Sequence, residues 1–232
     1  MKEFKDVYED ILYKLENDIN FHFVRYGDGE WSIILKNNVY DHLLKKWGDS
    51  LKPFSKILRD IVESKPQYYF GIQNLAYRNW HEEIDILTKD MNLVKADIFH
   101  SRSQKNTIKD FFNILSNKNV ILIGPEYLNK ISEFKFIRHI VTPEYHVWNS
   151  LDKIEKEIEE FISLQNEKIV LIYSCSIASK ILIDKFSDKK ITQIDTGSLL
   201  DPYVGVNSRS YHINVLKRLG KDESTFIYPK IK

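Results

Sequence analysis

Strand-like and helix-like segments alternate along most of this chain, and the alternation is clearest toward its C-terminal part. The apolar, β-branched run KIVLIYS at residues 168–174 is typical of a buried strand. Residues 176–186 then show helical spacing, and KITQIDTG at residues 190–197 is strand-like again. These segments occupy about the ~30 residues that a strand, helix and parallel strand need. The pattern predicts an α/β fold with a mostly parallel sheet flanked by helices.

The rest of the chain shows the same two kinds of segment. Apolar side chains recur at helical spacing in residues 4–16, 49–62, 79–90, 108–115 and 149–165. Strands are expected at residues 20–27, 67–73, 95–101, 119–125 and 134–141. A short helix suits residues 31–35 better than a returning strand, because Trp31, Ile34 and Leu35 are three and four residues apart. No repeat or linker divides the chain, so we predict a single domain spanning residues 1–232.

Composition limits the classes of partner. Lys and Arg number 34 against 33 Asp and Glu, and this net charge of +1 gives no overall attraction to nucleic acid or an anionic membrane. The single cysteine, Cys175, excludes an intramolecular disulfide and a cysteine-based metal cluster. The N-terminal segment lacks the apolar core of a signal peptide, and no run approaches the roughly 20 apolar residues that span a bilayer. We therefore expect a cytoplasmic protein.

Small, hydroxyl-bearing and acidic residues follow four of the expected strands. In a doubly wound sheet, ligands bind beyond the carboxyl ends of the strands, so these exits are candidate binding positions. They are residues 27–30, 124–126, 174–176 and 195–198. Glycine and serine let main-chain N–H groups approach an oxyanion closely at the start of a helix. Together the four exits predict an anion-binding site.

The sequence VRYGDGEW at residues 24–31 has two interpretations. Asp-Gly between apolar segments is a strong signal for a tight hairpin turn. The helical spacing after Glu30 instead favours a strand that leads directly into a helix. In that case Asp28 and Glu30 direct two carboxylates toward one point, an arrangement that suits Mg²⁺ or Mn²⁺. Arg25 lies two residues before the turn, where it could offset their charge or hold a phosphate.

The other exits leave alternatives open. Ser174 and Ser176 precede a helix, so they are a helix cap, a phosphate contact or both. Cys175 lies beside a buried strand, which is typical of packing, and nothing near it in sequence supplies a base. Asp195 and Asp201 either orient a sugar hydroxyl or act as a base, or they cap a turn. The histidines fit no zinc motif, and neither a P-loop nor a dinucleotide fingerprint occurs.

Three segments, VRYGDGEW, IYSCSIASKILIDKF and ITQIDTGSLLDPYVG, resemble the GT-D fold glycosyltransferases. This family was first catalogued as a domain of unknown function, and it has an R-x-G-D-G-E signature after the first strand. Its C-terminal block contains a small-residue loop, a helix and a strand that ends in Asp-x-Gly. SCSIAS departs from the Cys-Gly-Pro type of loop that the family typically has, and DPYVG resembles only part of the family.

The resemblance implies a Rossmann-like single domain that passes a sugar from a nucleotide-diphosphate sugar, with UDP as the expected nucleotide, to an acceptor hydroxyl. The acceptor would be a glycan, a glycoprotein or another polymer. Asp28 and Glu30 would bind Mn²⁺ or Mg²⁺, and Asp195 and Asp201 are the candidates for the catalytic base. The residues expected at the donor are Arg25, Gly27, Gly29, Ser174, Ser176, Gly197 and Ser198. Two alternatives are a metal-dependent phosphohydrolase and a non-catalytic nucleotide-binding module.

Overall fold

The computed structural model describes residues 2–36, 40, 41, 43, 48–164 and 167–221. Seven strands form one sheet in the order β3-β2-β1-β7-β6-β4-β5. They are β1 (His22–Tyr26), β2 (Tyr69–Ile72), β3 (Leu93–Lys95), β4 (Asn119–Pro125), β5 (Arg138–Thr142), β6 (Ile169–Tyr173) and β7 (Thr192–Asp195). All neighbouring strands pair in parallel. The predicted α/β fold is therefore confirmed.

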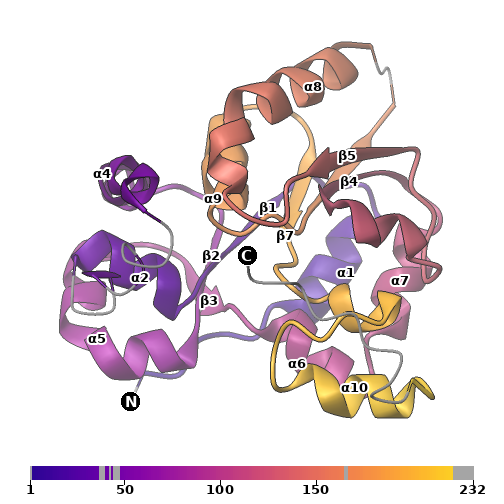
Figure 1. Cartoon of the computed structure of the whole chain (residues 1–232), viewed down its shortest axis with the longest axis horizontal. Coiled ribbons are helices and arrows are strands. Elements are labelled where there is room, and N and C mark those ends of the chain that lie inside the picture. The colour runs from indigo at the N-terminus through magenta and orange to yellow at the C-terminus, as the bar shows by residue number, and fades with distance from the viewer. Residues whose placement is uncertain (1, 37–39, 42, 44–47, 165–166, 222–232) are drawn as a thin grey trace.

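Helices cover both faces of this sheet (Figure 1). On the face that we call the α9 side lie α2 (Asp28–Leu35), α4 (Lys52–Glu63), α5 (Asn74–Leu87), α8 (Leu151–Leu164) and α9 (Ile177–Lys185). On the α1 side lie α1 (Tyr8–Glu16), α6 (Ile98–Gln104), α7 (Lys109–Leu115) and α10 (His212–Arg218). Four short 3-10 helices complete the described elements: η1 (Asp49–Leu51), η2 (Glu126–Lys130), η3 (Val147–Ser150) and η4 (Asp201–Val204).

The central strands are apolar on both faces because both faces are covered. In β6, Leu171 and Tyr173 pack on the α9 side, whereas Val170 and Ile172 pack on the α1 side. This alternation follows from the period of two along a strand. It explains why the strand reads as a continuous apolar run in the sequence.

The same alternation places the first site residue. Val24 and Tyr26 of β1 join the core on the α9 side, and Phe23 joins the core on the α1 side. Arg25 stands between Val24 and Tyr26, so its side chain points toward the α1 side. Glu30, which follows in α2, belongs to the opposite side of the sheet.

Some predicted boundaries were wrong. The strand expected at residues 95–101 ends at Lys95, and Ile98 begins α6. A short apolar run cannot be assigned by periodicity alone, and Ile98 and Phe99 pack on the α1 side as part of a helix. The strand expected at residues 134–141 is confined to β5, and the helix expected at residues 79–90 already begins at Asn74. Among the described residues, no helix combines the length and apolar character needed to cross a bilayer.

Candidate functional site

The chain leaves the neighbouring strands β1 and β7 toward opposite faces of the sheet. After β1 it enters α2 on the α9 side, whereas after β7 it continues through η4 to α10 on the α1 side. β1 and β7 pair directly through Phe23 and Ile194. In doubly wound sheets, ligands bind where the exits of neighbouring strands diverge in this way. We call residues 27–30 and 195–198, which flank this position, the switch point.

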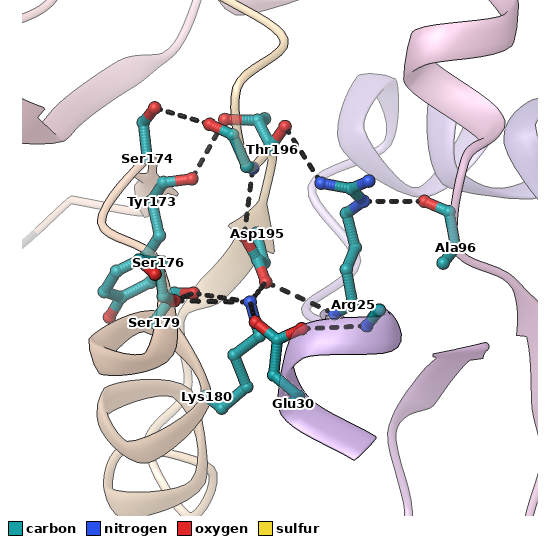
Figure 2. A network of polar contacts seen from close by, with 12 residues as sticks. Arg25, Glu30, Ala96, Tyr173, Ser174, Ser176, Ser179, Lys180, Asp195 and Thr196 are labelled. Atoms are coloured by element: carbon teal, nitrogen blue, oxygen red, sulfur yellow. Dashed lines mark hydrogen bonds and ion pairs between the residues drawn. The ribbon is translucent and has the colours of Figure 1, made fainter. Parts of the chain in front are cut away.

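A buried lysine joins two of the carboxylates predicted for the site. Lys180 lies in α9, and its ammonium donates a hydrogen bond to Oδ2 of Asp195 at 2.8 Å. The same ammonium lies 3.1 Å from Oε1 of Glu30 at the start of α2 (Figure 2). The Lys180 side chain is 5% exposed and that of Asp195 is 0% exposed. One buried ion-pair cluster thus holds together the exit of β1, the start of α9 and the end of β7.

The charges of this cluster stabilise one another. Burial alone would lower the pKa of Lys180, but the carboxylates of Asp195 and Glu30 outweigh burial and raise that pKa above its ordinary value. Burial alone would raise the pKa of Glu30, yet the Lys180 ammonium and the Gly27 N–H outweigh it and lower that pKa. Near neutral pH, Lys180 is therefore a cation and Glu30 an anion.

Glu30 also holds the first turn of α2. Its Oε2 accepts a hydrogen bond from the Gly27 N–H at 2.9 Å, as the glutamate of a capping box does. Because α2 begins at Asp28, directly after β1, VRYGDGEW is a strand-to-helix exit and not a hairpin turn. Both carboxylate oxygens of Glu30 are therefore in use, one with Gly27 and one with Lys180.

Asp28 has a different environment from Glu30. It is exposed, and its carboxylate makes no hydrogen bond or ion pair within the part of the chain that the structure describes. Its main-chain N–H donates to Oε1 of Gln73 at 3.3 Å. No group of three or more His, Cys, Asp or Glu side chains suited to a metal ion occurs among the described residues. As placed, Asp28 and Glu30 do not fit a cation that both would hold.

Arg25 occupies the α1 side of the switch point. Its Nε donates to the carbonyl of Ala96 at 2.8 Å, and its Nη2 pairs with Asp97 at 2.8 Å. Its Nη1 donates to the carbonyl of Thr196 at 3.5 Å (Figure 2). Each of the three guanidinium nitrogens donates to a protein oxygen, so Arg25 ties β1 to the exits of β3 and β7.

At the exit of β7, the main chain of Gly197 lies close against the Arg25 side chain. Its φ is +55°, and a Cβ added there would lie 2.0 Å from Nη1 of Arg25. Its N–H donates to Oδ1 of Asp195 at 3.0 Å, and its carbonyl accepts a hydrogen bond from the Ser174 hydroxyl at 2.5 Å. Glycine is required here for both its conformation and its lack of a side chain.

The hydroxyls of two predicted serines contact other protein groups, whereas the third predicted serine is exposed. Ser174 is bonded to Gly197, and the Ser198 hydroxyl lies 3.0 Å from that of Tyr211. Ser176 is exposed, and its hydroxyl does not cap α9. Its φ of +54° is unusual for a residue with a side chain, and such strain is most common at functional sites. Among these serines, Ser176 is the one open to a ligand.

The other predicted reactive groups are buried. Cys175 is 3% exposed, and burial raises the pKa of its thiol, as expected of a packing residue. Asp201 is also 3% exposed and accepts hydrogen bonds from the hydroxyls of Tyr127 and Ser208. Burial raises the pKa of Asp201 to about 6, although these hydrogen bonds oppose the shift. Neither Asp195 nor Asp201 presents an open carboxylate oxygen to an acceptor.

Two residues of the site were missed from the sequence. Lys180 follows Ser176 by four residues, so it lies on the same face of α9 as the helix start, and this spacing was the available signal. Asp97 was hidden because the segment that contains it was expected to be a strand. The structure shows that both residues neutralise groups that had been assigned to ligand binding: Lys180 pairs with Glu30, and Asp97 pairs with Arg25.

The fold is similar to that of solved structures. A glycosyltransferase (DUF1792) from Streptococcus sanguinis superposes with a TM-score of 0.61 at 14% identity, covering 84% of this chain and 81% of that one. A selenomethionine-substituted domain of unknown function 1792 gives 0.60 at 14% identity, covering 94% and 92%. A third structure, of domain of unknown function 1792 with a distinct glycosyltransferase fold, gives 0.56 at 15% identity over the same shares. The sequence matches no protein-family model and no curated protein. The likeness therefore confirms the predicted fold.

Proposed function

We propose that this protein is a glycosyltransferase that moves a sugar from a nucleotide-diphosphate sugar, in the first instance a UDP-sugar, to an acceptor hydroxyl on a glycan, glycoprotein or other polymer. The observation that carries this proposal is that the start of α9 lies beside the start of α2 at the edge of the switch point. The contact of 3.1 Å between Glu30 and Lys180 joins them. The fold likeness to a DUF1792 glycosyltransferase supports the choice of reaction.

The diphosphate of the donor would lie at these two helix starts. The first N–H groups of a helix have no partner within the helix, and they favour anions. In α2 they include the N–H of Gly29, where an added Cβ would meet no atom within 4 Å, so a ligand can approach the main chain closely. In α9 they follow Ser176, which is exposed. The two helix starts together supply donors from both sides of a diphosphate.

A positively charged side chain is also needed to stabilise the negative charge that develops on the leaving diphosphate. Lys180 is enclosed between Glu30 and Asp195, and Arg25 donates to Ala96 and pairs with Asp97. Arg209 is exposed, with one hydrogen bond from its Nη1 to the Ser208 carbonyl at 3.0 Å, and it precedes Tyr211, whose hydroxyl lies 3.0 Å from that of Ser198 at the exit of β7. We assign Arg209 to the leaving diphosphate, because its guanidinium can bind phosphate oxygens in a forked contact.

Asp28 is the open carboxylate at the switch point, and we assign it to the reacting sugars. An exposed carboxylate at a helix start can accept the proton of the acceptor hydroxyl, a contribution of typically about 10²- to 10⁴-fold. Asp195, predicted for this role, instead holds Lys180 and the Gly197 N–H. Asp201 is bonded to two hydroxyls. Positioning is the role that suits these two buried carboxylates.

The sequence predicts Mn²⁺ or Mg²⁺ at this site, and the carboxylate of Asp28 would hold it. When bound, such an ion would help to stabilise the charge of the leaving diphosphate. Of the two predicted ligands, only Asp28 has free carboxylate oxygens, because those of Glu30 are bonded to Gly27 and Lys180. The reaction proposed above therefore contains no step that depends on the ion.

A thermal-shift screen of nucleoside diphosphates and their sugars tests the donor site. A ligand at 100 times its Kd adds about 2.7 kcal/mol of stability, and about 2–4 °C per kcal/mol is expected for a chain of this size. The right nucleotide should thus raise the melting temperature by about 5–11 °C. If no nucleoside diphosphate raises it, the donor-site proposal fails.

The two alternatives predict different products. With the donor that binds best, release of nucleoside diphosphate should depend on an added acceptor hydroxyl. Equal release without an acceptor would indicate a hydrolase. Binding with no turnover under any condition would indicate a nucleotide-binding module. The substitution Asp28→Asn should remove the acceptor-dependent release without affecting the fold, which tests the role assigned to Asp28.

A further inference from the structure

The Lys180 ammonium sits in a shell made of oxygen atoms. Oδ2 of Asp195 lies 2.8 Å and Oε1 of Glu30 lies 3.1 Å from its Nζ. The carbonyl of Ser176 at 3.2 Å and the hydroxyl of Ser179 at 3.3 Å complete the shell (Figure 2). Two carboxylates and neutral oxygens converging on one point are the surroundings that a hard cation takes in proteins. In this protein the convergence point is occupied by a side chain.

The distances are those of an ammonium. Donor–acceptor separations of about 2.7–3.2 Å are normal for N–H···O hydrogen bonds, whereas Mg²⁺ demands oxygens at about 2.0–2.1 Å. A divalent ion at this point would have to displace a cation whose side chain is 5% exposed. A divalent ion beside it would experience repulsion between like charges. Either way the position between the two carboxylates already holds a cation.

We propose that the ammonium of Lys180 takes the place of a divalent cation between Glu30 and Asp195, so that the donor site forms and binds nucleoside diphosphate without a metal ion on Glu30. This inference rests on the proposed function for the identity of the ligand. Lys180 is a positioning residue. It fixes Glu30, and through Glu30 the first turn of α2, where Gly29 and Asp28 face the ligand.

The direct test uses Mn²⁺ alone as the probe, with the full chain and no nucleotide. Electron paramagnetic resonance measures free Mn²⁺, and the wild-type protein should bind none up to about 1 mM, a weak limit for protein cation sites. Lys180→Met should bind Mn²⁺ at least about tenfold more tightly than wild type, because a buried like charge is removed and two carboxylates are released.

The matched control is Lys185→Met. Lys185 lies on the same helix, but its ammonium pairs with Glu155 at the surface. It should leave Mn²⁺ binding at the wild-type level. A lysine with a purely structural role at position 180 would change stability only, so the gain of Mn²⁺ binding is the distinguishing readout. A folded Lys180→Met protein that still binds no Mn²⁺ would overturn the inference.

The wild-type protein keeps the inference testable if Lys180→Met does not fold. Mn²⁺ binding by the wild type that is lost in Glu30→Gln would show that Glu30 is a metal ligand, and the inference would be wrong. The nucleoside diphosphate should also raise the melting temperature in EDTA, and a shift seen only with Mn²⁺ would contradict the inference. If no nucleoside diphosphate binds at all, the proposed function fails, while the Mn²⁺ titration still decides the role of Lys180.

Discussion

Replacing Gly197 with alanine tests the contact that joins the exits of β1 and β7. A Cβ at this position would lie 2.0 Å from Nη1 of Arg25, and the backbone φ is +55°. The conformation costs an alanine about 1–2 kcal/mol. The guanidinium must also move, which disturbs its hydrogen bonds to Ala96 and Thr196, and each buried group left without a partner costs about 1–3 kcal/mol.

The two costs together make a loss of at least about 3 kcal/mol in the free energy of unfolding, or at least about 6–12 °C in melting temperature. Urea denaturation measures the first quantity and differential scanning calorimetry the second. The pair between Arg25 and Asp97 adds little to the sum, because water reaches the Asp97 side chain, which is 41% exposed.

Substitutions at two other glycines separate the conformational cost from the cost of displacing the Arg25 guanidinium. Gly220 has a φ of +70° but no atom within 4 Å of an added Cβ, so Gly220→Ala should show the conformational cost of about 1–2 kcal/mol alone. Gly29 has no atom within 4 Å and lies in α2 with an ordinary φ, so Gly29→Ala should change stability by less than about 1 kcal/mol and in the stabilising direction. If Gly197→Ala costs no more than Gly220→Ala, the close approach of Arg25 is wrong.

Asp28→Asn should lower turnover of the donor at least about 100-fold with an unchanged melting temperature, and retained turnover would contradict its assignment. Glu30→Gln should instead reduce stability by about 3 kcal/mol in urea denaturation, because it breaks a buried pair with Lys180; a melting temperature equal to wild type would refute that pair. The pKa of Asp201 is raised from 3.8 to about 6, so the stability that this group contributes is present below 3.8 and is lost as the pH rises through about 6. Asp201→Asn should remove that loss in denaturation series at several pH values, and parallel curves for both proteins would be the contrary result. The thiol of Cys175 should react with a thiol reagent at least about 100-fold more slowly in buffer than in urea, since burial raises its pKa; fast labelling of the folded protein would contradict this.

The sheet was predictable because its strands are apolar on both faces. β6 and β4 read as continuous runs of Ile, Val and Leu, and the helix after β6 has clear apolar spacing. The order of the strands was not predictable. β7 pairs with β1, and no local pattern shows which of several apolar strands will be neighbours. The short segment around Ile98 also failed, because a few apolar residues pack equally well in a strand or a helix.

The sequence indicates which residues meet at the candidate site but not which charged groups pair with them. The strand exits identified residues that the structure brings together, including Glu30 and Asp195. Spacing treats Asp28 and Glu30 as equivalent, since both follow β1 and have the same charge. Their difference arises from Lys180, whose contact with Glu30 depends on a helix about 150 residues later in the chain. Which carboxylate is free is therefore a property of tertiary packing.

The central pairing of β1 with β7 has a consequence for biosynthesis. The Arg25 N–H donates to Asp195, 170 residues further along the chain. Contacts of such long range form slowly, because a long loop must close before they contribute any stability. During translation, β1 can pair with β2 early, but its other edge waits for β7 and remains open to other strands. The switch point is thus among the last parts of the molecule to form, and nascent chains that stop before residue 195 should lack it altogether.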